Sequence, residues 1–129
     1  MEGYKAKVST VSRELDPTER IKFKDTSDAI GIDYALNQLE SMVLTIEYYG
    51  VLAIHNEHAE SENKDYNNYV FVTTDGEKYV TGSESLWSAF TDIADELADD
   101  GIYELPPIKF YKKESKNYKG KYFLTCSIA

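Results

Sequence analysis

Apolar and polar residues alternate along several short runs of the chain, and this two-residue period predicts β-strands. The first run covers residues 42–49, and after Gly50 it continues over residues 51–54. A glycine inside a strand often marks a bulge or a sharp bend, as at the corner of a barrel. We therefore expect one long bent strand in this part of the chain.

Two further runs, residues 69–73 and 78–81, flank the dipeptide Asp75-Gly76. This combination predicts a β-hairpin, because aspartate and glycine readily adopt the positive φ angles of tight turns. Between the long strand and this hairpin, residues 55–68 are rich in Glu, Asn and Asp. That composition predicts one long exposed loop.

A helix is predicted next, because four apolar residues recur at spacings of four, three and four. These residues are Leu86, Phe90, Ile93 and Leu97. Thr81 with Glu84, or alternatively Ser83, has the spacing of a helix cap. Gly101 stands where the helix is expected to end.

Two more strands are predicted at residues 108–113 and 121–128, joined by a basic loop over residues 114–120. The N-terminal quarter is less regular. Residues 21–24 alternate like a short strand, and residues 26–39 suit a short helix. The apolar positions of that helix are Ile32, Leu36 and Leu39.

The predicted order is a long bent strand, a hairpin, a helix and two final strands. Five strands in this order, with a helix between strands three and four, form an OB-type barrel. We expect a mainly β, single domain over residues 1–129, with an OB-fold core at 41–129 and an N-terminal strand and helix extension at 1–40. A small α+β roll with an open sheet is the alternative fold.

Charge is unevenly distributed along the chain, whose net charge is −9. Residues 1–24 contain six basic and four acidic residues, and residues 106–129 contain six basic and one acidic residue. Residues 25–105 contain eighteen acidic and two basic residues. The net charge alone argues against a nucleic-acid partner, but this distribution predicts a cationic edge on an anionic body, and a polyanion would bind that edge.

The sequence shows no clear catalytic or metal-binding pattern. It contains no glycine-rich phosphate loop and no cysteine-rich motif, and His55, Glu57, His58 and Glu60 do not have a zinc spacing. The single cysteine, Cys126, lies in an alternating strand and is expected to be a small buried side chain. We therefore expect no enzyme, no metal and no cofactor.

No stretch has the length of a membrane-spanning segment or the apolar core of a secretory signal. One cysteine also excludes an intramolecular disulfide, which agrees with a reducing compartment. We expect a cytoplasmic protein with no membrane partner.

Aromatic residues make up 13% of the chain, and many lie on the predicted strands. Strand alternation places one set of side chains in the core and the intervening set outside. The set expected inside is Val70, Val72, Val80, Ile108, Phe110, Leu124, Cys126 and Ile128. The outward set, completed by residues of the last loop, is the candidate nucleic-acid-binding set: Tyr69, Phe71, Tyr79, Lys109, Tyr111, Lys113, Lys116, Tyr118, Lys119, Lys121 and Phe123.

Such a mixture suits single-stranded nucleic acid, because aromatic rings stack on separated bases while lysines contact the phosphates. The candidate cations are all lysines, which favour point-charge contacts to phosphate over the forked contacts that arginine makes with bases. We therefore expect sequence-tolerant binding. The alternative for each residue alone is structural, since tyrosine favours strands and lysine protects sheet edges.

Three short segments resemble small OB-fold single-stranded-DNA-binding proteins of bacteriophages and mobile elements. They are Lys78-Tyr79-Val80-Thr81-Gly82-Ser83 before the helix, Ser115-Lys116-Asn117-Tyr118 in the last loop, and Tyr122-Phe123-Leu124-Thr125-Cys126 after it. The resemblance covers residues 41–129 and implies an OB-fold that coats single strands during DNA replication or recombination. It also implies stacking and phosphate contacts at Tyr69, Phe71, Tyr79, Lys116 and Lys119.

We therefore expect a single-stranded-DNA-binding protein, with replication or recombination proteins and further copies of itself as possible partners. An alternative is an acidic protein-interaction module or nucleic-acid mimic that inhibits a partner, because residues 25–105 are so acidic. A third is a structural assembly subunit that pairs through its sheet edges. The sequence leaves open the oligomeric state, the choice between DNA and RNA, and the site size.

Overall fold

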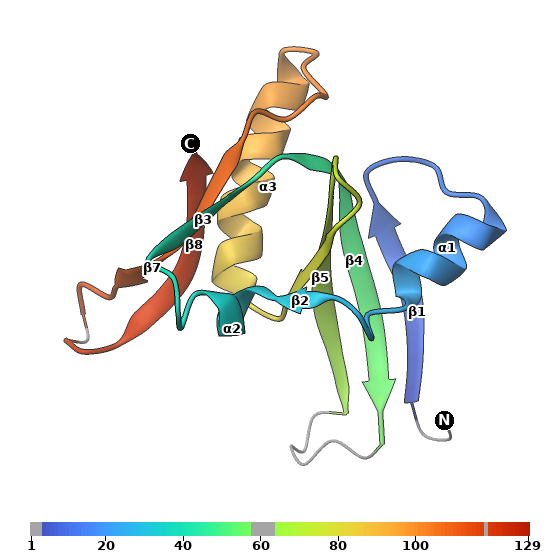
Figure 1. Cartoon of the computed structure of the whole chain (residues 1–129), viewed down its shortest axis with the longest axis horizontal. Coiled ribbons are helices and arrows are strands. Elements are labelled where there is room, and N and C mark those ends of the chain that lie inside the picture. The colour runs from blue at the N-terminus through green and yellow to red at the C-terminus, as the bar shows by residue number, and fades with distance from the viewer. Residues whose placement is uncertain (1–3, 58–63, 118) are drawn as a thin grey trace.

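The computed structural model describes residues 4–57, 64–117 and 119–129 (Figure 1). Strands take 43% and helices 24% of the chain, so the fold is mainly β, as predicted. The elements in chain order are β1 (Tyr4–Val11), α1 (Pro17–Lys24), β2 (Ile30–Gly31), α2 (Ile32–Ala35), β3 (Ser41–Leu44), β4 (Ile46–Asn56), β5 (Asp65–Thr73), β6 (Lys78–Thr81), α3 (Glu84–Asp99), β7 (Ile108–Glu114) and β8 (Tyr122–Ile128).

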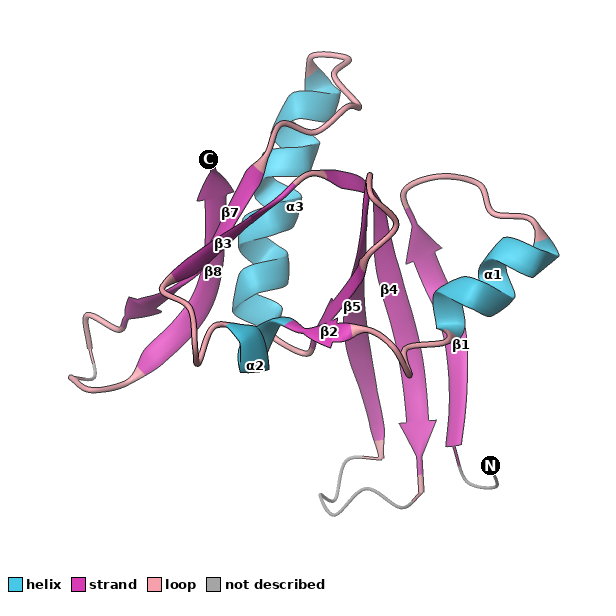
Figure 2. Cartoon of the chain, in the orientation of Figure 1, coloured by secondary structure: helices cyan, strands magenta, loops and turns pink. Residues whose placement is uncertain are grey.

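The strands form two sheets (Figure 2). A five-stranded sheet has the order β1-β4-β5-β6-β2, and among its described strands only β2 and β6 run parallel. A three-stranded antiparallel sheet has the order β3-β7-β8. Helix α3 packs against β8 and lies between the two sheets (Figure 1). The order of elements from β3 onward agrees with the sequence, but the ladders among the described strands do not join the sheets into one barrel, so a closed OB-type barrel stays a prediction.

The long strand predicted at residues 42–54 is divided between the two sheets. Its break lies at Thr45, not at Gly50, so that β3 pairs with β7 while β4 pairs with β5. Gly50 has a different role. A Cβ at this position would lie 2.4 Å from the carbonyl oxygen of Thr10, so the glycine lets β1 approach β4 closely.

The hairpin predicted around Asp75-Gly76 is confirmed, and Gly76 has a φ of 87°. The preceding loop is shorter than the predicted residues 55–68, because β4 continues to Asn56 and β5 begins at Asp65. Cross-strand pairing at this end overrides the polar composition that predicted a loop.

Helix α3 is confirmed, and Ser83 is its N-cap: the Ser83 hydroxyl accepts the N–H of Leu86 at 3.2 Å. At the other end the N–H of Gly101 donates to Ala98 and that of Ile102 donates to Leu97, both at 2.9 Å. With a φ of 77° at Gly101, these bonds form a Schellman motif.

The prediction for the N-terminal quarter is wrong in two places. Residues 21–24 belong to helix α1, because Asp16 and Glu19 form a capping box and Pro17 occupies the first turn. Within residues 26–39, where a longer helix was expected, only the short helix α2 forms. It buries Ile32, whereas Leu39, beyond the end of α2, is 52% exposed. Strand β1 was not predicted, and it forms an edge of the five-stranded sheet.

Two apolar clusters lie on opposite faces of the five-stranded sheet. The larger fills the space between this sheet, α3 and the three-stranded sheet: its largest members are Phe71, Phe90, Phe110 and Tyr69. The smaller is formed by Leu15, Phe23, Leu52, Ile54, Val70 and Val72. From Tyr69 to Thr73, strand β5 is therefore buried on both faces, and alternation along this half does not separate inside from outside.

No helix in the described part of the chain combines the length and apolar character needed to cross a membrane.

Candidate nucleic-acid interface

Two of the predicted stacking residues lie in the core and a third, Tyr79, is half-buried against it, which corrects their assignment to an outward face. Tyr69 and Phe71 are 5% and 0% exposed, because α3 and the three-stranded sheet cover this side of β5. Trp87 of α3 stacks on Tyr69 at 4.8 Å between ring centroids. Tyr79 packs against the same cluster, and burial raises the pKa of its hydroxyl. The rings of Tyr69 and Phe71 are thus enclosed by protein contacts and are not open to bases.

The hairpin formed by β7 and β8 does present the predicted outward residues. On β7, Ile108 and Phe110 are fully buried, while Lys109 and Lys113 are exposed and Tyr111 is half-buried. This alternation follows the prediction, because one face of the three-stranded sheet packs on the core and the other meets solvent.

Strand β8 shows the same alternation. Leu124 and Cys126 are buried, whereas Lys121 and Phe123 are exposed. Phe123 stands opposite Lys113 in the ladder. Ile128, predicted to face inward, is 53% exposed because it lies at the end of the strand.

Aromatic and cationic groups are interleaved on this outer face. The ammonium of Lys109 lies 5.5 Å from the centroid of the Tyr111 ring, and Phe123 is 39% exposed. Val43 on the neighbouring strand β3 is opposite Lys109 and is 54% exposed. The face can thus offer flat apolar surface and positive charge to the same ligand.

The tip of the hairpin adds Lys116 and Lys119, both exposed. Glu114, the acidic residue of this segment, accepts the N–H of Gly120 at 3.1 Å and so holds the turn together. Tyr118, another predicted member, lies outside the described residues. Lys112 points to the opposite face, where its ammonium donates to the side-chain oxygen of Asn37.

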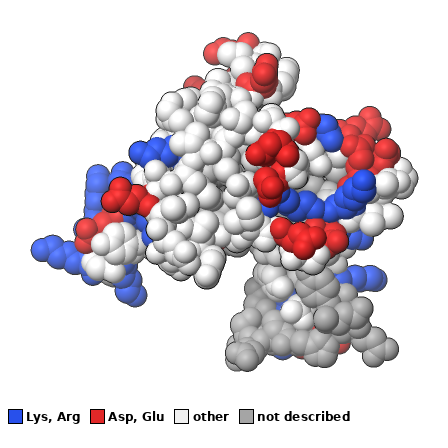
Figure 3. Space-filling model, in the orientation of Figure 1, with Lys and Arg blue, Asp and Glu red and all other residues white. Residues whose placement is uncertain are grey.

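Five lysines therefore surround Tyr111 and Phe123, and none forms an ion pair with another described residue. They are Lys109, Lys113, Lys116, Lys119 and Lys121. Figure 3 shows Lys and Arg atoms gathered at the end of the molecule where Figure 1 places this hairpin. We call these five lysines with Tyr111 and Phe123 the hairpin surface.

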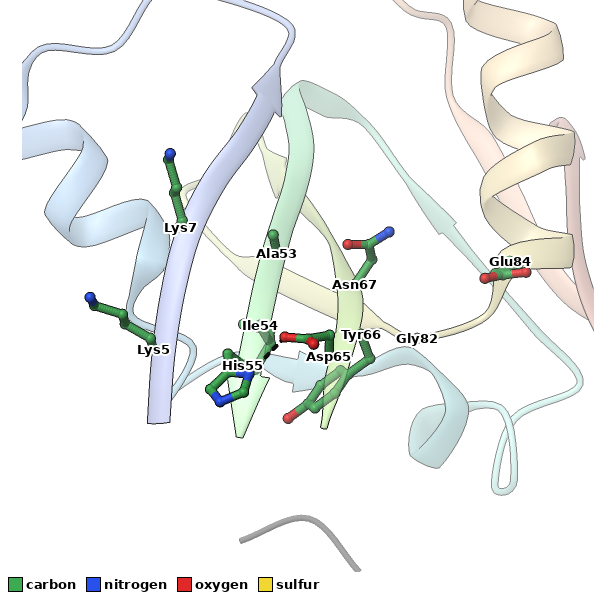
Figure 4. A pocket seen from close by; sticks show the side chains of 10 residues that line it. All are labelled: Lys5, Lys7, Ala53, Ile54, His55, Asp65, Tyr66, Asn67, Gly82 and Glu84. Atoms are coloured by element: carbon green, nitrogen blue, oxygen red, sulfur yellow. Dashed lines mark hydrogen bonds and ion pairs between the residues drawn. The ribbon is translucent and has the colours of Figure 1, made fainter. Parts of the chain in front are cut away.

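Sequence reasoning missed a groove of about 580 Å³ on the other sheet (Figure 4). Lys5 and Lys7 of β1 lie along it, and so do His55 and Asp65, whose Nδ1 and Oδ1 atoms are 2.7 Å apart. That hydrogen bond raises the pKa of His55. The alternation of Lys5 and Lys7 with apolar residues was the signal that could have revealed β1.

The described residues contain no group of three His, Cys, Asp or Glu side chains placed to hold a metal ion. His58 and Glu60 of the histidine-containing loop lie outside the described residues. Cys126 is buried, and burial raises the pKa of its thiol to about 11, so the reactive thiolate is disfavoured.

Comparisons of the chain with known protein families, with curated proteins and with solved structures find no match. The functional argument therefore rests on the geometry and charge of the hairpin surface.

Proposed function

We propose that this protein binds single-stranded DNA, without strong sequence preference, through the hairpin surface. The observation that carries the proposal is the alternation of unpaired lysines with Tyr111 and Phe123 on one solvent-facing side of β7 and β8. A duplex hides its base faces in the stack, whereas a single strand can place bases on the two rings and phosphates near the lysines.

The order of elements supports an OB-type interpretation of the fold. If β3 and β4 count as one bent strand, the chain runs strand, hairpin, helix, hairpin, and β3 pairs with β7. The β7–β8 turn then corresponds to the last connecting loop of an OB-fold, which commonly contributes to binding. The outer face of β5, a usual OB ligand surface, is covered by Leu15 and Phe23, so we assign binding to the hairpin surface instead.

Binding through the hairpin surface also suits the proposed biological role, which is to coat single-stranded DNA. A protein that coats single strands during bacteriophage or mobile-element replication or recombination needs sequence-tolerant contacts, and stacking with lysine–phosphate pairing supplies them.

The test is fluorescence anisotropy of a labelled oligothymidine titrated with the protein at low and then higher salt. We expect saturable binding that weakens with salt, since displaced counterions favour dissociation. The double variant Tyr111→Ala, Phe123→Ala should bind at least about 30-fold more weakly, because each stacked ring contributes about 1–3 kcal/mol. Trp87 fluorescence should change little when the oligothymidine binds, since this ring stacks on Tyr69 and packs against the core cluster, away from the hairpin surface.

Tyr103→Ala is the matched control, because this ring is 81% exposed and belongs to the segment between α3 and β7, outside the hairpin surface. It should bind as the wild type does. Unchanged affinity of the Tyr111→Ala, Phe123→Ala protein, in a sample shown to be folded, would remove the hairpin surface from the binding site.

A second candidate function is that of an acidic protein-interaction module. It is favoured by the exposed carboxylates along α3, with Tyr69 and Phe71 buried beneath the helix. These carboxylates are Asp92, Asp95, Glu96, Asp99 and Asp100. If the folded protein binds no oligonucleotide even at low salt, this candidate becomes the first to test, by affinity capture with wild-type protein and with a variant neutralised along α3.

A further inference from the structure

A second cationic surface lies on β1 and α1, at the opposite end of the long axis from the hairpin surface (Figure 1). Its exposed cations are Lys5 and Lys7 on β1 and Arg20 and Lys24 on α1. The two elements are far from the hairpin in space as well as in sequence, so one short stretch of ligand cannot contact both surfaces side by side.

Two grooves meet at Lys7. One, of about 370 Å³, runs between β1 and α1 and is lined by Lys7, Val8, Pro17, Arg20, Ile21 and Lys24. The other is the groove of about 580 Å³ that contains Lys5, Lys7 and His55. In Figure 4 the side chains of Lys5 and Lys7 extend to the same side of β1. The two grooves thus share Lys7 at the edge of the five-stranded sheet. The larger groove is also lined by Asp65 and Glu84, so the lysine-lined edge and the groove beside α1 are the parts suited to a polyanion.

The groove beside α1 has the chemistry of a phosphate site. Its lining contains three cations and no carboxylate. Glu19, the acidic residue of α1, is occupied by its 2.9 Å ion pair with Arg13 and by the helix cap. The flanking carboxylates also have partners within the protein: Asp16 accepts the N–H of Glu19, and Asp25 accepts from Ser27. Arg20 donates one N–H to the carbonyl of Leu15 at 2.7 Å, which orients the guanidinium and leaves its other donors free for a ligand.

The surface also offers apolar contact. Ile21 is 69% exposed within the groove beside α1. An apolar side chain among cations suits a ligand that alternates phosphates with sugars and bases, more than it suits a simple inorganic anion.

The surface is held in place by packing beneath it. Phe23 anchors α1 in the smaller core cluster, and the ammonium of Lys78 donates to the carbonyl oxygens of Lys22 and Asp25 at the end of the helix. A bulge lies between Val8 and Thr10 of the edge strand β1. Bulges and lysines oppose pairing with another strand, so this edge favours a polyanion over strand addition.

We propose that the β1–α1 edge is a second surface for the nucleic-acid backbone, so that one molecule holds two separate segments of nucleic acid at its two ends. This inference rests on the proposed function of the hairpin surface.

The test uses two triple variants of equal net charge. The edge variant is Lys5→Gln, Lys7→Gln, Lys24→Gln, and the hairpin variant is Lys109→Gln, Lys113→Gln, Lys121→Gln. All six lysines are exposed, and circular dichroism with thermal melting checks that both variants fold. Protein is added to a biotinylated oligothymidine on streptavidin, and capture of a second, fluorescent oligothymidine is measured.

Wild-type protein is expected to capture the second oligothymidine. Each variant should capture at least tenfold less of the second oligothymidine. In solution each should still bind one oligothymidine, the hairpin variant more weakly than the edge variant, because the groove beside α1 offers no aromatic ring for stacking. If the edge variant captures as much as wild type, bridging arises from the hairpins of two copies, and the edge inference is overturned while the proposed function stands.

The opposite result distinguishes the hairpin assignment from the bridging inference. If the hairpin variant binds like wild type and the edge variant loses all binding, the edge is the sole site, and both the hairpin assignment and the bridging inference are overturned. If wild-type protein binds no oligothymidine, both are likewise overturned.

Discussion

Two aromatic residues that occupy the same kind of position in the sequence differ in burial in the folded protein. Phe71 and Phe123 both lie on alternating strands, yet Phe71 is fully buried and Phe123 is 39% exposed. The difference comes from what covers each strand: α3 lies over β5, while nothing among the described residues covers the outer face of β8. Burial of a ring beneath a helix stabilises the fold but removes the ring from any ligand.

Cys126 allows a direct test of the core at the level of one side chain. Because burial raises the pKa of its thiol to about 11, we expect native protein at pH 8 to react slowly with a thiol-specific disulfide reagent. The same protein in denaturant should react at the rate of a free thiol. Rapid, complete reaction of the native protein would contradict the buried position of Cys126.

The raised pKa also has a consequence for stability. Since the folded-state pKa is higher than the ordinary value of 9.0, any stability that Cys126 contributes is complete below pH 9 and is lost as the pH rises through about 11.

The elements of this fold depend on close contacts that single positions permit. Strand β4 lies between the edge strand β1 and the central strand β5 of the five-stranded sheet. At Gly50 it lies so close to β1 that a Cβ would meet the Thr10 carbonyl at 2.4 Å and the Phe23 ring at 3.0 Å. One glycine thus sets the approach of both β1 and α1 to the sheet.

Gly50→Ala should therefore destabilise the protein by about 1–3 kcal/mol, because the backbone of β1 must move to accept the methyl group. Chemical denaturation followed by circular dichroism measures the change. Gly82→Ala is the control, since a Cβ there would meet nothing within 4 Å, and we expect a change within about 0.5 kcal/mol. Equal stability of the Gly50→Ala protein and wild type would contradict the close packing of β1 on β4.

On the scale of the whole molecule, the two apolar clusters share one sheet. Strands β4 and β5 contribute alternate side chains to both: Val51 and Tyr69 to the larger cluster, Leu52 and Val70 to the smaller. Loss of either cluster exposes one face of the same strands, so the two are expected to unfold together.

This coupling predicts a single unfolding transition. The emission of Trp87, in the larger cluster, should change at the same denaturant concentration as the far-ultraviolet circular dichroism. Phe23→Ala, in the smaller cluster, should lower both midpoints equally, at a cost of about 3–5 kcal/mol. If this variant shifts the circular dichroism and leaves the Trp87 transition in place, the clusters are independent.

Elements with local signals are predictable from the amino-acid sequence alone. The Asp75-Gly76 turn, the apolar stripe of α3 and the alternation of β7 and β8 all depend on neighbours within a few residues, and the structure contains each of them. The same local alternation placed Lys109, Lys113 and Phe123 correctly on the outer face of the three-stranded sheet, because this sheet has solvent on one side.

Which strand faces are covered depends on packing between segments that are distant in the chain. Nothing near Tyr69 in the sequence shows that Trp87 stacks on it, or that Leu15 and Phe23 close the other face of β5. The same long-range packing brings Lys7 beside Arg20 and sets the hairpin surface at the far end of the molecule. Alternation along a strand indicates that its two faces have different surroundings. Burial, however, depends on contacts between distant segments, and a local sequence pattern does not show these contacts.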